Sequence, residues 1–169
     1  HSWQMVNADY PFGMWKVAVD PTSSDHLWLS AEGFGVVKLR GLTGKANLAV
    51  ALTIAGVEHP GNLAVSAKGE VLVADRGTQQ FKLFSAAGSL EHSYGKPGGY
   101  STGPPDVSAD RFWFFPAYIP GENGGSGGAP VAFANDANDT IWVGDPGNKR
   151  MLQLARDGSQ LDEVLFIPR

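Results

Sequence analysis

The 169-residue sequence contains no cysteine, which excludes disulfide bonds and thiol chemistry. Charged residues make up only 18% of it, and a formal net charge of −4 offers no general attraction for phosphates. Lys149 and Arg150 are the only adjacent basic pair, so no nucleic-acid partner is expected. No stretch approaches the roughly 20 apolar residues that cross a bilayer, so no membrane span is expected.

The sequence also lacks an initiator methionine, and its first residues lack the basic and apolar regions of a signal peptide. We therefore expect either a processed product or a piece of a longer protein. The absence of cysteine leaves the compartment open, with an extracellular or periplasmic location favoured. Hydrophobic residues reach 43%, enough for a core, while 22 glycines and 11 prolines indicate many short elements joined by tight turns. An all-β fold is the first expectation.

Three segments of the sequence align with one another without gaps. Each has an apolar triplet, a glycine six residues after the start of the triplet, an apolar strand, and a second glycine eleven residues after the first. The triplets begin at Leu27, Val71 and Ile141, the first glycines are Gly33, Gly77 and Gly147, and the second are Gly44, Gly88 and Gly158. A repeat of this length is the unit of a repeating architecture.

Each triplet follows another apolar stretch and a polar turn, as in a β-hairpin. With a less regular fourth strand, each copy forms a four-stranded meander that cannot bury both of its faces alone. Copies therefore stack around an axis, as the blades of a propeller do. The bulkiest apolar side chains are expected between blades, namely Trp28, Phe81, Phe84, Trp142 and Met151.

The second and third copies resemble the NHL-repeat family, in which an apolar strand ends in Val-Ala/Gly-Asp before a glycine turn. Asp75 and Asp145 match the aspartate of that pattern, whereas the first copy has Ala31 there. The resemblance covers roughly residues 11 to 168. It implies an all-β propeller with NHL-type four-stranded blades, and about three of them are present.

The spacing of the copies is uneven, because Gly33 and Gly77 are 44 residues apart whereas Gly77 and Gly147 are 70 apart. We predict a single propeller segment, 1–169, with blades at about 11–56, 57–95 and 129–168 and an insertion at 96–128. Propellers have four to eight blades, so three do not close a ring. We expect an open arc or half propeller, six-bladed when completed, closed by further blades or by self-association with a second copy.

The resemblance also implies a ligand-binding face, formed by the loops between second and third strands and by the connections between blades. Candidate binding residues there are Glu32, His59, Asp75, Arg76, Arg111, Trp113, Phe114, Asp145, Asn148 and Arg150. The favoured alternative for Asp75 and Asp145 is that each carboxylate accepts backbone N–H bonds within its glycine turn. The run from Arg111 to Phe115 either grips a partner or forms an ordinary core strand, and the core strand is favoured.

Metal sites find little support in the sequence. The segment 135–139 resembles an acidic calcium loop but lacks the glycine and glutamate of an EF-hand, so turn chemistry is favoured. A zinc site needs three or four converging ligands, and of His1, His26, His59 and His92 only His59 is well placed. No cofactor is predicted. The glycine-rich stretch 121–128 lacks the lysine and the helix of a phosphate loop.

Regular repeats without a catalytic motif favour a non-catalytic binding or scaffold module. Its partner would be a protein or a carbohydrate, held by the loop face and by the insertion at 96–128. The alternative is a fragment of a metal-dependent propeller hydrolase or lyase, whose sign would be a tightly bound metal.

Overall fold

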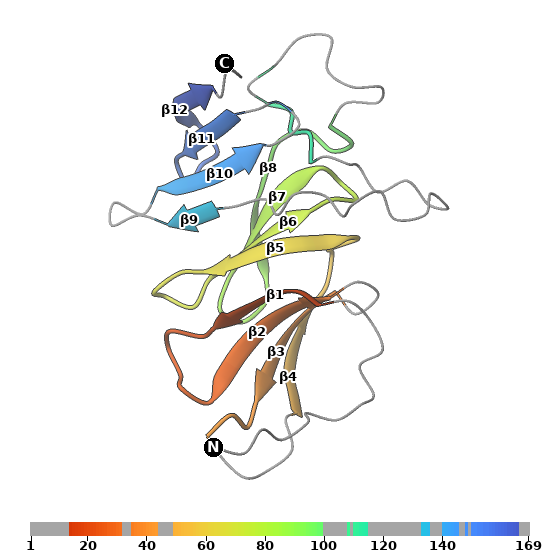
Figure 1. Ribbon diagram of the computed structural model, residues 1–169, viewed down its shortest axis with the longest axis vertical. Helices are drawn as coiled ribbons and strands as arrows, with labels where there is room; N and C mark the ends of the chain where they lie inside the picture. The colour runs from red at the N-terminus through yellow and green to blue at the C-terminus, as the bar shows by residue number, and fades with distance from the viewer. Residues whose placement is uncertain are drawn as a thin grey trace.

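The computed structural model describes residues 14–31, 35–43, 49–99, 108, 110–114, 133–135, 140–145, 148 and 150–165 (Figure 1). These residues form three antiparallel four-stranded sheets. The first sheet contains β1 (Met14–Val19), β2 (His26–Ala31), β3 (Gly35–Arg40) and β4 (Ala49–Ile54). The second contains β5 (Pro60–Val65), β6 (Val71–Asp75), β7 (Gln80–Phe84) and β8 (Leu90–Tyr94). The third contains β9 (Phe133–Asn135), β10 (Ile141–Asp145), β11 (Arg150–Leu154) and β12 (Gln160–Leu165).

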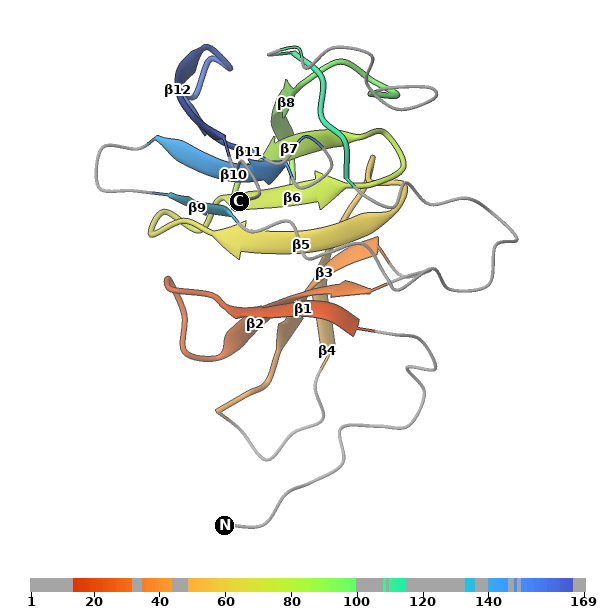
Figure 2. The same cartoon turned by 45° about the horizontal axis from the view of Figure 1, so that its top comes forward.

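In every sheet the strands are hydrogen-bonded in chain order, which makes each sheet a meander. The first strands lie together, since β5 contacts both β1 and β9 and lies between them in both views (Figures 1 and 2). The protein is therefore all-β, an open arc of three blades with their first strands on the inside. Within the described part of the chain, no helix has the length and apolar character needed to cross a membrane.

The middle blade buries both of its faces, and alternate residues of β6 point to opposite neighbours. We call the side toward the previous blade the trailing face and the side toward the next blade the leading face. Val71 and Val73 belong to a cluster with the first blade, whereas Leu72 and Ala74 belong to a cluster with the third. Burial on both sides explains why β6 is apolar without interruption until Asp75.

Three of the bulky residues predicted to lie between blades are confirmed there. Trp28 and Phe84 are fully buried between the first and second blades, and Phe81 is fully buried between the second and third. Trp142 and Met151 are only partly buried, because they lie on the leading face of the third blade.

The gap-free alignment of the copies is wrong by one residue in the first blade. Ala31 pairs with Gly35, whereas Asp75 pairs with Gln80 and Asp145 with Arg150. The hairpin of the first blade is thus one residue shorter, and β3 is shifted relative to the other copies. Its buried Val36, rather than the next residue, occupies the place that Phe81 has in the second blade.

Candidate functional site

The candidate site is the loop face of the second and third blades. Two loops form it, one joining β6 to β7 and one joining β10 to β11. In both blades, the chain that leads into the blade is hydrogen-bonded to the aspartate at the start of this loop. Before the third blade this chain is a long connection whose described part, residues 95–99, 108 and 110–114, we call the strap.

Asp75 is fully buried at the end of β6 and fixes the connection between the first two blades. Its carboxylate accepts hydrogen bonds from the backbone N–H groups of Glu58 at 3.1 Å, His59 at 3.0 Å and Gly77 at 3.0 Å. Only the bond from Gly77 lies within the glycine turn that the sequence indicated. The other two come from the chain entering the blade.

Lys82 completes this arrangement from β7. Its Nζ lies 2.7 Å from the Asp75 carboxylate and donates a 2.6 Å hydrogen bond to the carbonyl of Gly56. Burial is the largest single influence on the pKa of Asp75 and raises it, but the hydrogen bonds from Lys82 and from the backbone N–H groups of His59 and Glu58, together with the charge of Lys82, lower the pKa below its ordinary value. Asp75 is therefore held as a carboxylate.

Gly77 lets the connection pass this close to the loop. A Cβ atom at this position would lie 2.7 Å from the Cβ of Glu58 and 2.9 Å from the His59 ring. The first glycine of the repeat thus serves close approach of the entering chain, a requirement that no other residue meets.

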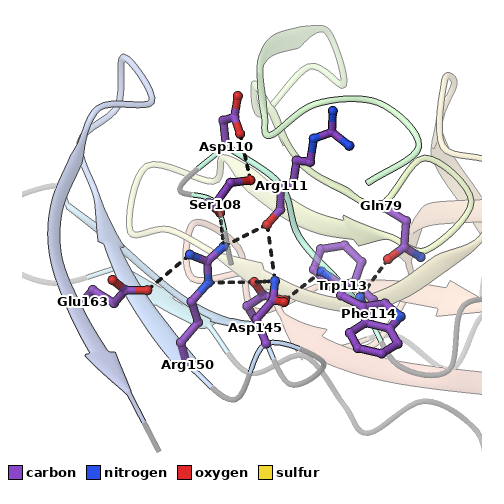
Figure 3. Close-up of polar contacts among 10 residues, drawn as sticks. Gln79, Ser108, Asp110, Arg111, Trp113, Phe114, Asp145, Arg150 and Glu163 are labelled. Carbon is purple, nitrogen blue, oxygen red and sulfur yellow. Dashed lines mark hydrogen bonds and ion pairs between the residues drawn. The ribbon is translucent and has the colours of Figure 1, made fainter. Parts of the chain in front are cut away.

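Asp145 occupies the same place in the third blade and is also fully buried (Figure 3). Its carboxylate accepts hydrogen bonds from the backbone N–H of Trp113 at 2.8 Å, from the Asn148 amide at 2.7 Å and from Arg150 Nε at 2.9 Å. Burial raises the pKa of Asp145 above its ordinary value, and these hydrogen bonds offset that rise only in part.

Arg150 ties the strap to the third blade through its buried guanidinium group (Figure 3). One terminal nitrogen donates 2.8 Å hydrogen bonds to the carbonyls of Ser108 and Arg111, and the other lies 3.2 Å from the carboxylate of Glu163 on β12. Because the guanidinium group has five donors in a fixed plane, it can bridge several acceptors at once.

The two blades therefore share one device, which we call the Asp–cation clamp. In each blade of this pair, the aspartate at the end of the second strand accepts hydrogen bonds from the backbone N–H of the chain that enters the blade. A cation on the third strand donates hydrogen bonds to backbone carbonyls of the same entering chain. Lys82 is the cation of the second blade and Arg150 that of the third. In the first blade Ala31 takes the place of the aspartate, and Lys38 pairs with Asp20 near the opposite end of the sheet.

The strap places alternate aromatic rings inside and outside the protein. Phe112 and Phe114 are buried and pack edge-on against Phe81, with ring centroids 5.0 and 4.8 Å away, while Trp113 between them is partly exposed. The backbone N–H of Phe114 donates a 2.7 Å hydrogen bond to Gln79. Phe114 thus lies in the core and offers a partner no surface, although residues 111–114 form no strand.

The structure divides the predicted site residues into two groups. Asp75, Arg76, Phe114, Asp145, Asn148 and Arg150 are buried, whereas His59, Arg111 and Trp113 are partly exposed. Glu32 lies outside the described residues. Asp145, Asn148, Arg150, Arg111 and Trp113 are brought together, and Asp75 lies with His59 in the other clamp.

Sequence reasoning missed Lys82 and Gln79. Lys82 did leave a signal, since it is the only charged residue in the apolar strand Phe81-Lys82-Leu83-Phe84. A lysine there requires a buried partner. Gln79 left no such signal in the sequence. Its backbone adopts a positive φ of 56°, a conformation that favours glycine or asparagine.

No group of three or more histidine, cysteine, aspartate or glutamate side chains is placed to hold a metal within the part of the chain that the structure describes. His26 begins β2, His92 lies on the outer strand β8, and His59 lies at the clamp formed by Asp75 and Lys82 in the second blade. Of the acidic segment 135–139, all but its first residue lies outside the described residues.

Comparison with known proteins supports the fold alone. No protein-family model and no curated protein matches the sequence. A streptogramin B lyase structure matches with a TM-score of 0.61 and 16% identity, over 97% of this chain and 44% of that one. The WD40 β-propeller domain of Doa1 matches with a TM-score of 0.59 and 12% identity, over 90% of this chain and 40% of that one.

A catalytically inactive virginiamycin B lyase from Staphylococcus aureus, solved with quinupristin, matches with a TM-score of 0.58 and 14% identity. That match covers 98% of this chain and 45% of the lyase. This chain is therefore a protein of the β-propeller fold with about three blades. It spans less than half the length of these solved structures, and the particular NHL family stays a prediction from the sequence.

Proposed function

We propose that this chain is a non-catalytic binding or scaffold module with NHL-type blades, and that its loop face holds a protein or carbohydrate partner. The observation that carries the proposal is the way the strap presents Trp113. Its backbone is bound by Asp145, and its two neighbours are buried in the core. The indole is therefore partly exposed on a segment that is fixed at three successive residues.

Because the backbone of this segment is already ordered, little backbone entropy is lost when Trp113 binds a partner, so more of the contact energy is available for affinity. Tryptophan and arginine are the residues that most often dominate binding energy at interfaces. Arg111 lies two positions away, and its guanidinium group donates a 3.2 Å hydrogen bond to the carbonyl of Gly99. The strap thus provides an aromatic ring and a cation on one rigid support.

The acidic candidates serve this function indirectly. Asp75 and Asp145 are fully buried, and the hydrogen bonds that they accept come from the connections and loops of the fold. Their role in the proposal is to fix the loop face, and the direct contacts fall to Trp113, Arg111 and His59.

Immobilised oligosaccharides and immobilised peptides of defined sequence test the proposal. The wild-type chain should be retained by a restricted set of either kind. Trp113→Ala should reduce retention at least about tenfold, as expected for a central interface residue. Leu90→Ala, which changes an exposed residue of β8, is the control and should leave retention unchanged. Equal retention of the Trp113→Ala variant would refute the proposed site.

The second candidate is the metal-dependent lyase, favoured by the likeness to streptogramin B lyase over 97% of this chain. The purified protein would then contain a stoichiometric metal by elemental analysis. It would also consume quinupristin, the compound with which the inactive lyase was solved, and chelator would stop this reaction. Unchanged quinupristin in the presence of added divalent metal would count against this candidate.

A further inference from the structure

We propose that Gln79 is a positioning residue of the loop face. Its side-chain amide fixes the place of Trp113 on the strap relative to His59 in the second blade, so that a partner contacts both residues at once. This inference rests on the proposed function, which assigns direct contacts to Trp113 and His59. It goes further in naming the residue that holds the two together and in extending the bound surface over two blades.

The backbone of Gln79 is strained. Its φ of 56° makes it the only residue other than glycine with a positive φ in the part of the chain that the structure describes. In the hairpin of the first blade, by contrast, the positive φ falls on Gly35, which adopts it without steric cost. Glycine or asparagine would relieve the strain at position 79. Strained residues of this kind persist where the surrounding structure holds them, and they cluster at functional sites.

The side chain of Gln79 gives a reason for keeping glutamine there. It is 5% exposed, and both ends of its amide are used. Nε2 donates a 2.7 Å hydrogen bond to the carbonyl of Arg76, and Oε1 accepts a 2.7 Å hydrogen bond from the backbone N–H of Phe114 on the strap (Figure 3). Asparagine would suit the backbone better, but its side chain is one methylene shorter and would not reach both partners.

These two bonds belong to a continuous chain of hydrogen bonds between the contact residues. The backbone N–H of Arg76 donates a 2.9 Å hydrogen bond to the carbonyl of His59. The carbonyl of Arg76 then accepts the bond from Gln79, which in turn accepts the bond from Phe114, the residue that follows Trp113. All other links of this chain are backbone groups. The side chain of Gln79 is therefore the one link that a substitution can remove.

The strap also packs closely over Gln79. A Cβ atom at Gly99 would lie 2.8 Å from the Cβ of Gln79 and 2.5 Å from the carbonyl oxygen of Phe112. The backbone N–H of Gly98 donates a 2.8 Å hydrogen bond to the carbonyl of Thr78, the residue before Gln79. The first and last described stretches of the strap therefore meet at Gln79, and the position of this residue sets where the strap lies.

Trp113 is thus supported from two blades. Asp145 of the third blade binds its backbone N–H, and Gln79 of the second blade binds the next N–H along the strap. The spacing between Trp113 and His59 depends on both supports. A partner that contacts the two residues recognises this spacing, and loss of the support from Gln79 weakens its binding even though neither contact residue has changed.

Amide hydrogen exchange measured by NMR tests the positioning role in Gln79→Asn. The probe is the N–H of Trp113, because its own acceptor, Asp145, is left intact. This N–H should exchange at least about tenfold faster in the variant, since the strap is held less firmly. Gln153→Asn is the matched control. It makes the same change on β11, where Gln153 donates a 3.0 Å hydrogen bond to Thr140, and should leave the exchange of Trp113 unchanged.

A purely structural role of Gln79 in its hairpin predicts the opposite result. Asparagine adopts positive φ more readily than glutamine, so the hairpin would be stabilised and the exchange of Trp113 would stay the same or become slower. That outcome would overturn the proposal. Gln79→Gly is the second variant, because it removes both the strain and the side chain, and it should also accelerate the exchange. Urea unfolding shows that each variant remains folded.

Retention on the immobilised oligosaccharides and peptides that bind the wild type tests the two-blade surface. Gln79→Asn and His59→Ala should each weaken retention at least about fivefold, and Gln153→Asn should not. Full retention of His59→Ala would overturn the two-blade surface. Full retention of Gln79→Asn beside a loss in Trp113→Ala would overturn the role of Gln79 and leave the proposed function standing. Full retention of Trp113→Ala would refute the proposed function and, with it, this inference.

Discussion

Asp145 accepts a 2.8 Å hydrogen bond from the backbone N–H of Trp113, which precedes it by 32 residues. Asp75 does the same for the backbone N–H of His59, which precedes it by 16 residues, at 3.0 Å. In the second and third blades the aspartate therefore binds the chain that leads into that blade. The repeated residue has a repeated structural task, even though the connections that it binds differ greatly in length.

Asp145→Asn should lower the free energy of unfolding by about 3 kcal/mol, as breaking a buried ion pair does. Arg150 would remain buried without the carboxylate that now lies 2.9 Å from its Nε. Urea unfolding measures the change. Asp110→Asn is the control, since Asp110 pairs with Lys96 at the surface, where both side chains are more than half exposed. It should have no measurable effect, and equal losses in the two variants would contradict the clamp.

The Asp75 clamp should make stability depend on acid pH. The folded pKa of Asp75 is lowered relative to the unfolded chain, whose aspartates titrate at about 3.9. The stabilisation is therefore complete above that value and is lost as the pH falls through the lower folded pKa. Urea unfolding between pH 7 and pH 2 should show a decline below about pH 4. Asp75→Asn should make this decline shallower, and an unchanged slope would refute the assignment.

Substitutions at Gly95 and Gly98 distinguish the cost of backbone strain from the cost of a steric clash. Both have positive φ, 88° and 79°. A Cβ at Gly95 would lie 2.5 Å from the Phe112 ring, whereas one at Gly98 would meet nothing within 4 Å. Gly98→Ala should cost only the strain of a left-handed alanine, about 1 kcal/mol. Gly95→Ala should cost clearly more, because it also displaces Phe112, and urea unfolding of both variants would show the difference.

The sequence predicted the three copies, the all-β fold and the rings of Trp28, Phe81 and Phe84 between blades, because these depend on local apolar periodicity and on glycine turns. It did not predict the register of the first blade. A hairpin shorter by one residue leaves the apolar run from Val36 to Leu39 looking the same, while every side chain of β3 changes face. In the sequence alignment, β3 of the first blade is therefore matched to residues of the other blades that do not occupy equivalent positions in the structure.

The bonds that hold the strap to the third blade also escaped prediction, for a different reason. The bonds from Arg150 to the carbonyls of Ser108 and Arg111 span 42 and 39 residues, and backbone carbonyls leave no trace in a sequence. The two cations of the clamps differ in position as well as in type. Arg150 is paired directly with Asp145, whereas Lys82 lies two residues beyond the partner of Asp75. A sequence alignment would therefore not have matched Lys82 with Arg150.

The alternation along the strap gives the sharpest test of which aromatic rings are structural. The rings of Phe112 and Phe114 are stacked at 5.9 Å with an angle of 15° between them, and both are buried against Phe81. Phe114→Ala should therefore lower the free energy of unfolding by about 3–5 kcal/mol, the usual cost of removing a buried phenylalanine ring. Trp113→Ala should cost about 1 kcal/mol or less, since its ring is partly exposed and its backbone N–H, which binds Asp145, is retained.

Urea unfolding of the two variants measures this difference, and Phe112→Ala should behave like Phe114→Ala. Near-UV circular dichroism supplies a second readout, because loss of either buried ring loosens the packing around Phe81. A loss for Trp113→Ala as large as that for Phe114→Ala would show that the indole is part of the core. In that case the strap would only fill the core between the second and third blades, and the binding surface would have to be sought around His59.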